Sequence, residues 1–335
     1  MPSRQQPDQS PDANVPAADA FNPVGGRAIF LTGPTASGKS AVGLQLAELI
    51  NAEILSLDSM AVYRGMDVGT AKPSVAERDR VPHHLIDLVA PSEEFSLGQY
   101  IAAAHQAMHD ISSRGKRSLF VGGTPLYLTG LLRGVDSGPP PDWEFREHWQ
   151  SIAEEQGKEA VHARLAEIDP PSAKRLNPND LKRVIRAMEV HKITGRPISD
   201  TPAHFAQPVP REDCRVYWLN WPTDELNPRI NSRVESMLES GWREEVRILA
   251  AAGPLGRTAS QAVGYRQLLE TLNSQQDSNS LIADIQTATR RFAKRQRTWL
   301  RSLSECRVVE MNANRDVAEV AAEIAEDIGG FAAVQ

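Results

Sequence analysis

The sequence predicts an α/β protein in which a parallel sheet carries a helical insertion. A short apolar run, a glycine-rich loop and an amphipathic helix follow one another over residues 28–50. Further short apolar runs at 53–57, 117–121 and 215–221 alternate with helical patterns, as expected of a parallel sheet. A charged helical stretch, 143–195, separates the last two of these runs. Because a strand follows it, we interpret the stretch as an insertion within one α/β domain.

Size and composition indicate a soluble globular protein. The chain has 335 residues, of which 41% are hydrophobic and 24% charged, which is enough for a sizeable core. No window approaches the apolar length that spans a bilayer, and the amino terminus carries no apolar signal segment, so we expect a cytoplasmic protein without a membrane partner. Cys214 and Cys306 are isolated, which argues against a disulfide framework or a cysteine zinc site. The sequence shows no extended apolar stripe of the kind that mediates self-association or binds an obligate protein partner. We therefore expect a monomer.

Composition also divides the chain. Residues 1–26 are rich in Pro, Asp, Gln and Ala, which is typical of a disordered leader. Residues 134–141, GVDSGPPP, are typical of a hinge. We therefore expect a leader over 1–26, a core made of 27–135 and 209–330, and a helical insertion domain over 136–208.

The glycine-rich loop matches the phosphate-binding pattern G-x-x-x-x-G-K-[ST] at every fixed position. Backbone amides of such a loop turn towards phosphate oxygens, and the helix amino terminus adds partial positive charge. Lys39 supplies a full charge, and the Ser40 hydroxyl is a candidate ligand for Mg²⁺. A plain glycine turn is the alternative. The predicted phosphate-binding residues are Gly33, Pro34, Thr35, Ala36, Ser37, Gly38, Lys39 and Ser40.

Asp58 ends the next strand and opens an unusual stretch, DSMAVYRGMDVGTAKP. The carboxyl end of a strand in an open α/β sheet faces the crevice where ligands bind, so Asp58 is a candidate general base or Mg²⁺-side carboxylate. Its alternative role is to cap the next helix. The turn 122–124 ends the following strand at the same crevice, with Thr124 as a predicted N-cap and Pro125 at the first helical position, unless it is merely a tight turn.

Arginine pairs mark two further helices. Lys182, Arg183 and Arg186 fall within one helical turn of the insertion, either as a solvated face or as a lid that contacts a polyanion.

Asn227 and Pro228 predict the start of a helix that ends at Gly253. Arg229 and Arg233 then lie in its opening turns, the unfavourable end of the helix dipole for a cation, which indicates a bound anion.

The pattern from 282 to 303 predicts an amphipathic helix with a basic face. The formal net charge of −6 would argue against a nucleic-acid partner only if charge were evenly spread. Six basic residues without an acid indicate contact with a phosphate backbone rather than an ordinary solvated face. These residues are Arg290, Arg291, Lys294, Arg295, Arg297 and Arg301.

The ordered motifs resemble those of one family, the bacterial tRNA dimethylallyltransferases, also called tRNA isopentenyltransferases. The motifs are GPTASGKS, DSMAVYRGMDVGTAKP, VGGTPLY, NDLKRVIRAMEV, VGYRQ and TRRFAKRQRTWLR. The resemblance covers about residues 27–310. It implies a P-loop kinase-like core that transfers a dimethylallyl group from dimethylallyl diphosphate, with Mg²⁺. The acceptor it implies is the exocyclic amine of the adenosine 3′ of the anticodon, in the anticodon stem-loop of tRNA.

The same resemblance implies roles for individual residues. The loop 33–40 would hold a diphosphate, with Thr35 in the catalytic site, Asp58 would be the general base, and Arg233 would steady the leaving group. Ser40 stands where Thr is frequent, and either hydroxyl can serve Mg²⁺. The residues that match tRNA-contacting regions are Asp58, Ser59, Met60, Ala61, Thr124, Lys182, Arg183, Val184, Ile185, Arg186, Gly264, Tyr265, Arg266 and Gln267.

Two other functions fit parts of the pattern. A small-molecule P-loop kinase with a helical lid would use Arg183 and Arg186 as phosphate clamps, but it leaves the basic cluster at 290–301 unexplained. A nucleotide-gated RNA-binding protein has no need of Asp58 in the crevice. The guanine-reading motif N-K-x-D is absent from the sequence, which disfavours ordinary GTPases.

Overall fold

The computed structural model divides the chain into two compact units, residues 1–134 with 208–335, and residues 135–207. Most of the expected leader, 1–26, lies outside the described residues. The described ranges are 23–134, 138–200, 207–272 and 278–332.

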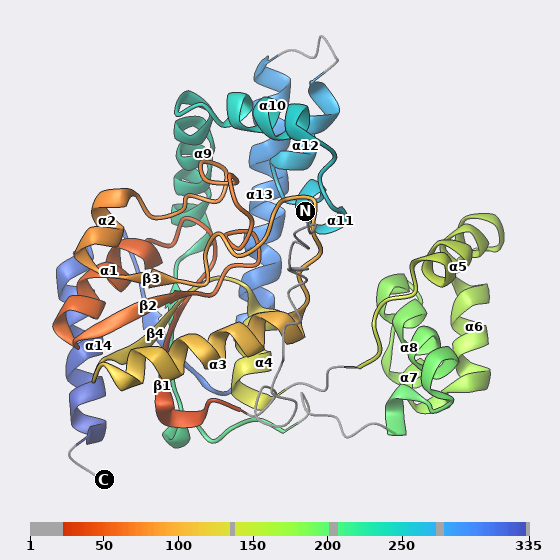
Figure 1. Ribbon diagram of the computed structural model, residues 1–335, viewed down its shortest axis with the longest axis horizontal. Coiled ribbons are helices and arrows are strands. Elements are labelled where there is room, and N and C mark those ends of the chain that lie inside the picture. The colour runs from red at the N-terminus through yellow and green to blue at the C-terminus, as the bar shows by residue number, and fades with distance from the viewer. Residues whose placement is uncertain (1–22, 135–137, 201–206, 273–277, 333–335) are drawn as a thin grey trace, which may run out of the picture. The chain divides into compact units, whose positions relative to one another are not determined.

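Among the described residues, the first unit contains a sheet of six parallel strands in the order β3-β2-β4-β1-β5-β6 (Figure 1). The predicted α/β class is therefore confirmed. The central strand β1 pairs with β4 on one side and with β5 on the other. The strands are β1 (Ala28–Thr32), β2 (Ala52–Ser56), β3 (His83–His84), β4 (Arg117–Gly122), β5 (Arg215–Asn220) and β6 (Cys306–Glu310).

Helices cover both faces of this sheet. Helices α1 (Lys39–Leu49) and α14 (Val317–Ala332) pack against each other on one face, over a core of apolar strand residues such as Leu31 and Leu119. Helices α3 (Leu97–Ser113) and α4 (Pro125–Arg133) follow β3 and β4 and pack on the other face. Strand side chains alternate between the two faces, and Phe30 stacks on Phe120 with 5.0 Å between ring centroids.

A helical layer stands beyond the carboxyl ends of the strands (Figure 1). A second apolar core joins these helices to the loop after β2, with Val62, Tyr63 and Trp242 among its members. The helices are α9 (Thr223–Glu239), α10 (Trp242–Ala252), α11 (Arg257–Ser260), α12 (Tyr265–Thr271) and α13 (Ser278–Arg301), and the short helix α2 (Val75–Arg80) follows the loop.

The helix predicted from Asn227 to Gly253 is wrong in two respects. Helix α9 begins one turn earlier, after Pro222, because Leu226 is buried in the core and draws that turn into the helix. Pro228 therefore lies inside the helix. The chain breaks at Gly241, whose φ of +95° is left-handed, and α10 is a separate helix.

The two arginines are not at a helix terminus. Arg229 and Arg233 lie in the middle of α9, so the helix dipole says nothing about a bound anion there.

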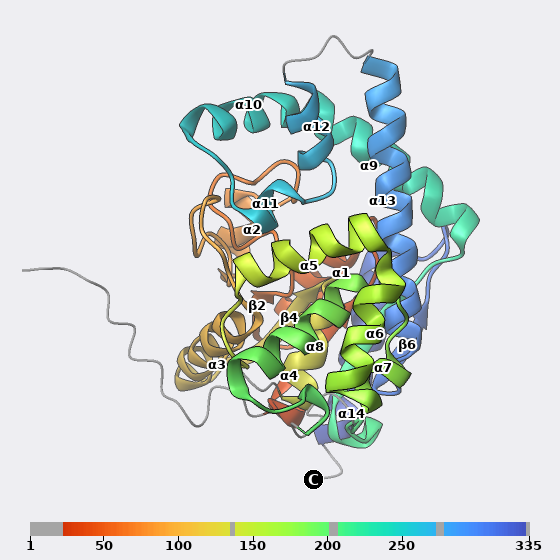
Figure 2. The ribbon, with the colours of Figure 1, turned by 90° about the vertical axis from the view of Figure 1, so that its right-hand side faces the viewer.

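The second unit is a bundle of helices with its own apolar core (Figure 2). Val161, Leu165 and Val184 are fully buried in it. The buried Glu189 carboxylate accepts hydrogen bonds from the Arg146 guanidinium at 2.7 and 2.8 Å. The helices are α5 (Trp143–Gln156), α6 (Lys158–Ile168), α7 (Pro170–Arg175) and α8 (Leu181–Thr194).

The chain leaves and re-enters the first unit at one point. Arg133, at the end of α4, donates to Glu305 Oε1 at 2.7 Å, and the backbone N–H of Val209 donates to the same oxygen at 3.2 Å. Both connecting segments are therefore anchored side by side to one buried carboxylate. Within the described part of the chain, no helix combines the length and apolar character that a bilayer crossing requires.

Candidate active site

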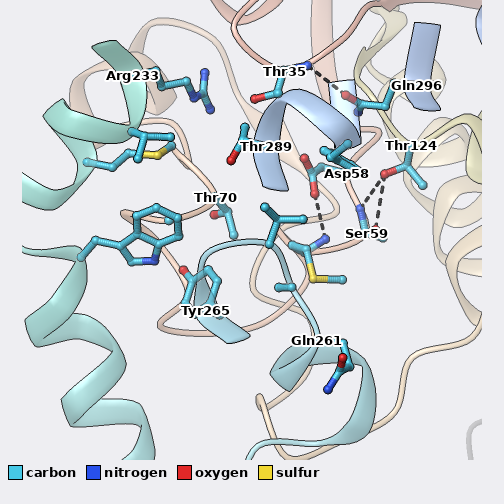
Figure 3. A pocket seen from close by; sticks show the side chains of 18 of the residues that line it. Thr35, Asp58, Ser59, Thr70, Thr124, Arg233, Gln261, Tyr265, Thr289 and Gln296 are labelled. Carbon is cyan, nitrogen blue, oxygen red and sulfur yellow. Dashed lines mark hydrogen bonds between the residues drawn. The ribbon is translucent and has the colours of Figure 1, made fainter. Parts of the chain in front are cut away.

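A pocket of about 310 Å³ lies at the carboxyl ends of β1, β2 and β4, where the sheet meets the helical layer (Figure 3). Its walls come from the phosphate loop, the loop after β2, the turn after β4 and helices α9 to α13. All of them belong to the first unit. The predicted site residues that line it are Thr35, Lys39, Asp58, Ser59, Met60, Thr124, Arg233, Tyr265 and Arg295.

The phosphate loop is shaped by close backbone packing. A Cβ on Gly33 would lie 2.7 Å from Ser37 Oγ and 3.1 Å from the Leu219 carbonyl oxygen, so only glycine fits there. Gly38 has a left-handed φ of +84° and opens α1. Lys39 follows at the first helical position, and its Nζ donates to the Pro34 carbonyl at 3.3 Å. Ser40 is exposed in the same first turn. The loop thus presents a helix amino terminus and a lysine to the pocket.

One aromatic and one cationic side chain support the loop from outside. Trp221 Nε1 donates to the Ser37 carbonyl at 2.9 Å, and Arg229 Nε donates to the Ala36 carbonyl at 3.0 Å. The Arg229 guanidinium lies 4.2 Å above the Trp221 ring centroid. A second, open concavity on this side is lined by Arg229 and Arg233 together with residues of the loop. The support by Trp221 was not predicted, because it comes from a residue far along the chain.

Asp58 is held by a turn. Its Oδ1 accepts the backbone N–H of Met60 at 2.8 Å, and the next residue, Ser59, donates its N–H to Thr124 Oγ1 at 3.0 Å. The alternative prediction, that Asp58 caps a helix, is wrong because the residues after it form turns. Thr124 does stand at the N-cap of α4 with Pro125 next, but its hydroxyl bonds Ser59 rather than its own helix. The ends of β2 and β4 are thereby joined at the pocket.

Lys39, Arg233 and Asp58 influence one another's charge at this end of the pocket. Burial, together with the Arg233 charge, lowers the pKa of Lys39 from 10.5 to about 8, while Asp58 opposes this shift. Burial also lowers the pKa of Arg233, and Asp58 again opposes. Two desolvated cations beside one carboxylate form a site that a multiply charged anion would stabilise.

Gln296 is a site residue that the sequence interpretation missed. Its side chain, 4% exposed, projects from α13 between the phosphate loop and the turn after β4. Oε1 accepts the N–H of Thr35 at 3.0 Å, and Nε2 donates to the Gly123 carbonyl. A Cβ on Gly123 would lie 2.6 Å from Gln296 Nε2, which explains the glycine. Gln296 therefore ties three separate segments together at the pocket.

The loop after β2 is fixed by a carboxylate on α10. Glu245 Oε2 accepts the backbone N–H groups of Asp67 at 2.8 Å and Val68 at 2.6 Å. Glu245 Oε1 accepts the Tyr265 hydroxyl at 2.6 Å, and burial raises the pKa of that phenol well above its usual range. The next residues of the loop, Gly69 and Thr70, form part of the pocket wall.

A buried lysine fixes the same loop from its far end. The Lys72 ammonium donates to the Tyr63 carbonyl at 2.6 Å, to Asp67 at 2.7 Å and to Asp87 at 2.6 Å. These three acceptors satisfy its donors. Lys72 is therefore structural here.

The basic face of α13 runs from the surface into the pocket. Arg291 and Lys294 are exposed, and Arg295 lines the pocket. Arg290 is engaged with a neighbouring helix, since its Nη1 donates to Asn231 Oδ1 at 2.6 Å.

The predicted residues of the insertion lie in the second unit. Lys182 and Arg183 are exposed on α8. Val184 and Ile185 are buried in the core of that unit, so their side chains pack against its own helices and present no surface for the predicted RNA contact. Arg186 is hydrogen-bonded within its own unit.

The segment 264–267 is mostly internal. Gly264 has a left-handed φ of +86°, and its N–H donates to Gln267 Oε1 at 2.8 Å. Both are buried, as is Ala61, so only Arg266 of these residues offers an exposed side chain. Their packing shapes the wall behind Tyr265.

Among the described residues, few side chains at the pocket could act as ligands of a divalent cation. Ser40 and Asp58 supply oxygens of the kind that Mg²⁺ accepts, and phosphate oxygens with water commonly complete its shell. Among the residues the structure describes, no three or more His, Cys, Asp or Glu side chains gather for a metal. The residues thus fit an ion that is held jointly with a bound phosphate.

Comparison with known proteins gives consistent matches. Residues 61–303 match the family model of IPP transferase. A tRNA dimethylallyltransferase of Rhodopirellula baltica is 42% identical over 323 residues, which cover 93% of this chain and 97% of that protein. One of Methylibium petroleiphilum is 44% identical over 301 residues, which cover 88% and 92%.

Solved structures match as well. A tRNA isopentenylpyrophosphate transferase from Bacillus halodurans aligns with a TM-score of 0.67 at 35% identity, over 91% of this chain and 96% of that one. A eukaryotic dimethylallyltransferase acting on tRNA aligns with a TM-score of 0.74 at 27% identity, over 91% and 79%.

Proposed function

The chain belongs to the IPP transferase family, and from this membership we propose that it transfers a dimethylallyl group from dimethylallyl diphosphate to tRNA. The acceptor is the exocyclic amine of the adenosine directly 3′ of the anticodon, and the products are isopentenyladenosine and diphosphate. The enzyme acts as a monomer in the cytoplasm. The observation that carries the proposal is one pocket lined by a phosphate loop, by Asp58 and by a basic residue of α13, Arg295.

The first step of the mechanism is donor binding. The diphosphate lies on the loop amides at the amino terminus of α1, with Lys39 and Arg233 beside it. As the bond between the allylic carbon and the diphosphate oxygen breaks, negative charge grows on that oxygen. Donors fixed in a water-poor site stabilise this charge more in the transition state than in the ground state. Mg²⁺, held by Ser40 and the diphosphate, would add Lewis-acid stabilisation of the departing group.

The acceptor requires a base. The exocyclic amine of adenine is a poor nucleophile, and the new N–C bond leaves a proton that must be removed. The Asp58 carboxylate accepts this proton, a role that contributes on the order of 10² to 10⁴ in rate. The hydrogen bond from Met60 orients this carboxylate in the pocket wall.

The adenine must leave its stack to reach the pocket. Enzymes that act on a base extrude it, at a cost of a few kcal/mol, into a site that reads its edge. Thr124 and Gln261 supply hydroxyl and amide groups on the pocket wall for this purpose. The exposed cations Arg291 and Lys294 hold the phosphates of the surrounding stem-loop.

Incubation of the protein with unmodified tRNA, Mg²⁺ and dimethylallyl diphosphate tests the proposal. The expected result is a dimethylallyl adenosine, detected by its mass after digestion to nucleosides. A parallel incubation contains ATP, and ATP turnover there, with no gain in nucleoside mass in either mixture, would support a kinase instead. tRNA binding without either reaction would leave only an RNA-binding function.

A further inference from the structure

We propose that Trp242 closes the prenyl end of the pocket and restricts the donor to a single isoprene unit. This inference rests on the proposed function, since it concerns how the pocket selects among allylic diphosphates.

The pocket has a polar end and an apolar end. Thr35 and Arg233 lie together at one side of it, and Tyr265 lies on the other (Figure 3). Met237 lies one helical turn after Arg233 on α9, and both line the pocket. In this proposal the diphosphate meets Arg233 and the prenyl chain extends along α9. The apolar residues on its way are Val234, Met237, Trp242, Ala262 and Val263.

The Trp242 indole fills the space between two glycines. A Cβ on Gly69 would lie 2.0 Å from its Nε1, and a Cβ on Gly264 would lie 1.9 Å from its Cη2. The side chain is 2% exposed, and the Tyr265 ring packs on it edge-to-face with 5.6 Å between centroids. No other residue type than glycine leaves room for the ring on either side.

The neighbours of the indole are themselves held in place. The Tyr265 hydroxyl donates to Glu245, and the same carboxylate accepts N–H groups of the loop that contains Gly69. Displacing the indole would thus disturb a hydrogen-bonded network as well as close packing. A second isoprene unit would have to overpack this wall, and inserted carbons in a packed interior are destabilising.

Replacing Trp242 with a smaller residue should enlarge the pocket. An indole is larger than one isoprene unit, so its removal opens a space between Gly69 and Gly264 that is continuous with the pocket. Geranyl diphosphate, which has one isoprene unit more than dimethylallyl diphosphate, is the donor that such a space accommodates.

The test compares the two donors with wild type, Trp242→Leu and Trp242→Ala, using unmodified tRNA and nucleoside mass as the readout. Wild type is expected to transfer dimethylallyl and to discriminate strongly against geranyl. In the variants dimethylallyl transfer falls, because the fit is looser, and the ratio of geranyl to dimethylallyl kcat/KM rises by on the order of 10²-fold. Trp242→Leu removes less volume than Trp242→Ala. Its ratio of geranyl to dimethylallyl kcat/KM serves as the test if Trp242→Ala does not fold.

Trp218→Leu is the matched control. Trp218 lies in β5, is 4% exposed and does not line the pocket. This variant should lower Tm without changing the donor ratio. An unchanged ratio in Trp242→Leu, or a wild type that uses both donors equally, would overturn the proposal. A wild type that transfers neither group would instead overturn the proposed function.

Discussion

Lys39 and Arg233 bring two desolvated cations to one end of the pocket, with Asp58 as the neighbouring carboxylate. Asp58 raises the pKa of both cations, against the larger effect of burial. Asp58 thus helps to keep Lys39 charged, and in the proposed mechanism it also takes up the proton of the acceptor amine. Substitutions at these residues separate the two.

Asp58→Asn removes the base and retains the shape of the side chain. We expect kcat to fall by about 10² to 10⁴, while tRNA affinity changes little. Single-turnover kinetics and tRNA titration measure the two quantities. Asp79→Asn, at an exposed position of α2, is the control and should behave as wild type. Transfer by Asp58→Asn at a near wild-type rate would show that another group accepts the proton.

The lowered pKa of Lys39 predicts that kcat/KM for the donor depends on pH in the alkaline range. A pKa lowered to about 8 means that the free enzyme loses this ammonium as pH rises through that value. Attraction to the diphosphate is lost with it, so kcat/KM for the donor should decline above pH 8, as it reports the free enzyme. Lys39→Arg keeps its charge throughout this range and should flatten the decline. Equal declines in both proteins would assign the titration to another group.

The predicted residues make contacts with close neighbours in the sequence, whereas the residues that were missed contact residues far away in the sequence. The N-cap position of Thr124, with Pro125 at the first helical position, was predicted and is confirmed, because both residues are local to the start of α4. Gln296 was missed, since its partner Thr35 lies 261 residues away. Trp242 was not predicted as a pocket residue, because nothing in the sequence relates it to Gly69. Such signals exist only after folding.

The basic face of α13 is the element that should govern tRNA affinity. Arg291 and Lys294 are exposed, whereas Arg290 is bonded to Asn231. Replacing Arg291 and Lys294 with Ala should weaken tRNA binding and reduce the slope of log Kd against log salt by about 1 for each lost phosphate contact. Adding Arg290→Ala should change the slope less. Binding measured over a salt series gives the slopes.

Arg80→Ala provides the comparison for that experiment. Arg80 is an exposed cation on α2 that pairs with Glu48 at 3.0 Å. It should leave the salt slope unchanged. Equal effects of the α2 and α13 substitutions would contradict a specific role for α13.

At the level of elements, the strands with continuous apolar runs were predicted and are confirmed. These are β1, β2, β4 and β5, each within one residue or so of its expected limits. Strand β3 has two residues, too few for a periodic pattern, and β6 is an edge strand that alternates Val with charged residues. Neither was predicted, and nor was α14. Pro228 was assigned to a helix start because proline is typical there, yet burial of Leu226 extends the helix past it.

At the scale of the whole molecule, the pocket and the insertion belong to different units. All pocket-lining residues come from the first unit, and the second has its own apolar core. Arg133 and Val209 both bond Glu305, so the chain ends on either side of the insertion are close together. A short flexible linker can therefore replace residues 135–207.

Such a replacement should leave a folded core that still binds diphosphate. We expect a cooperative thermal transition and an unchanged affinity for inorganic diphosphate by calorimetry. Affinity for tRNA should fall, because the exposed cations Lys182 and Arg183 are lost with the insertion. Loss of the thermal transition would show that the core depends on the insertion. Unchanged tRNA affinity would show that the insertion takes no part in binding.

Transfer to an altered tRNA tests the central claim most directly. Two synthetic tRNAs would differ only 3′ of the anticodon, one with adenosine and one with purine riboside, which lacks the exocyclic amine. With dimethylallyl diphosphate and Mg²⁺, intact mass should rise by one dimethylallyl group for the adenosine tRNA and stay unchanged for the other. Equal mass gain in both, or none in either, would contradict transfer to that amine.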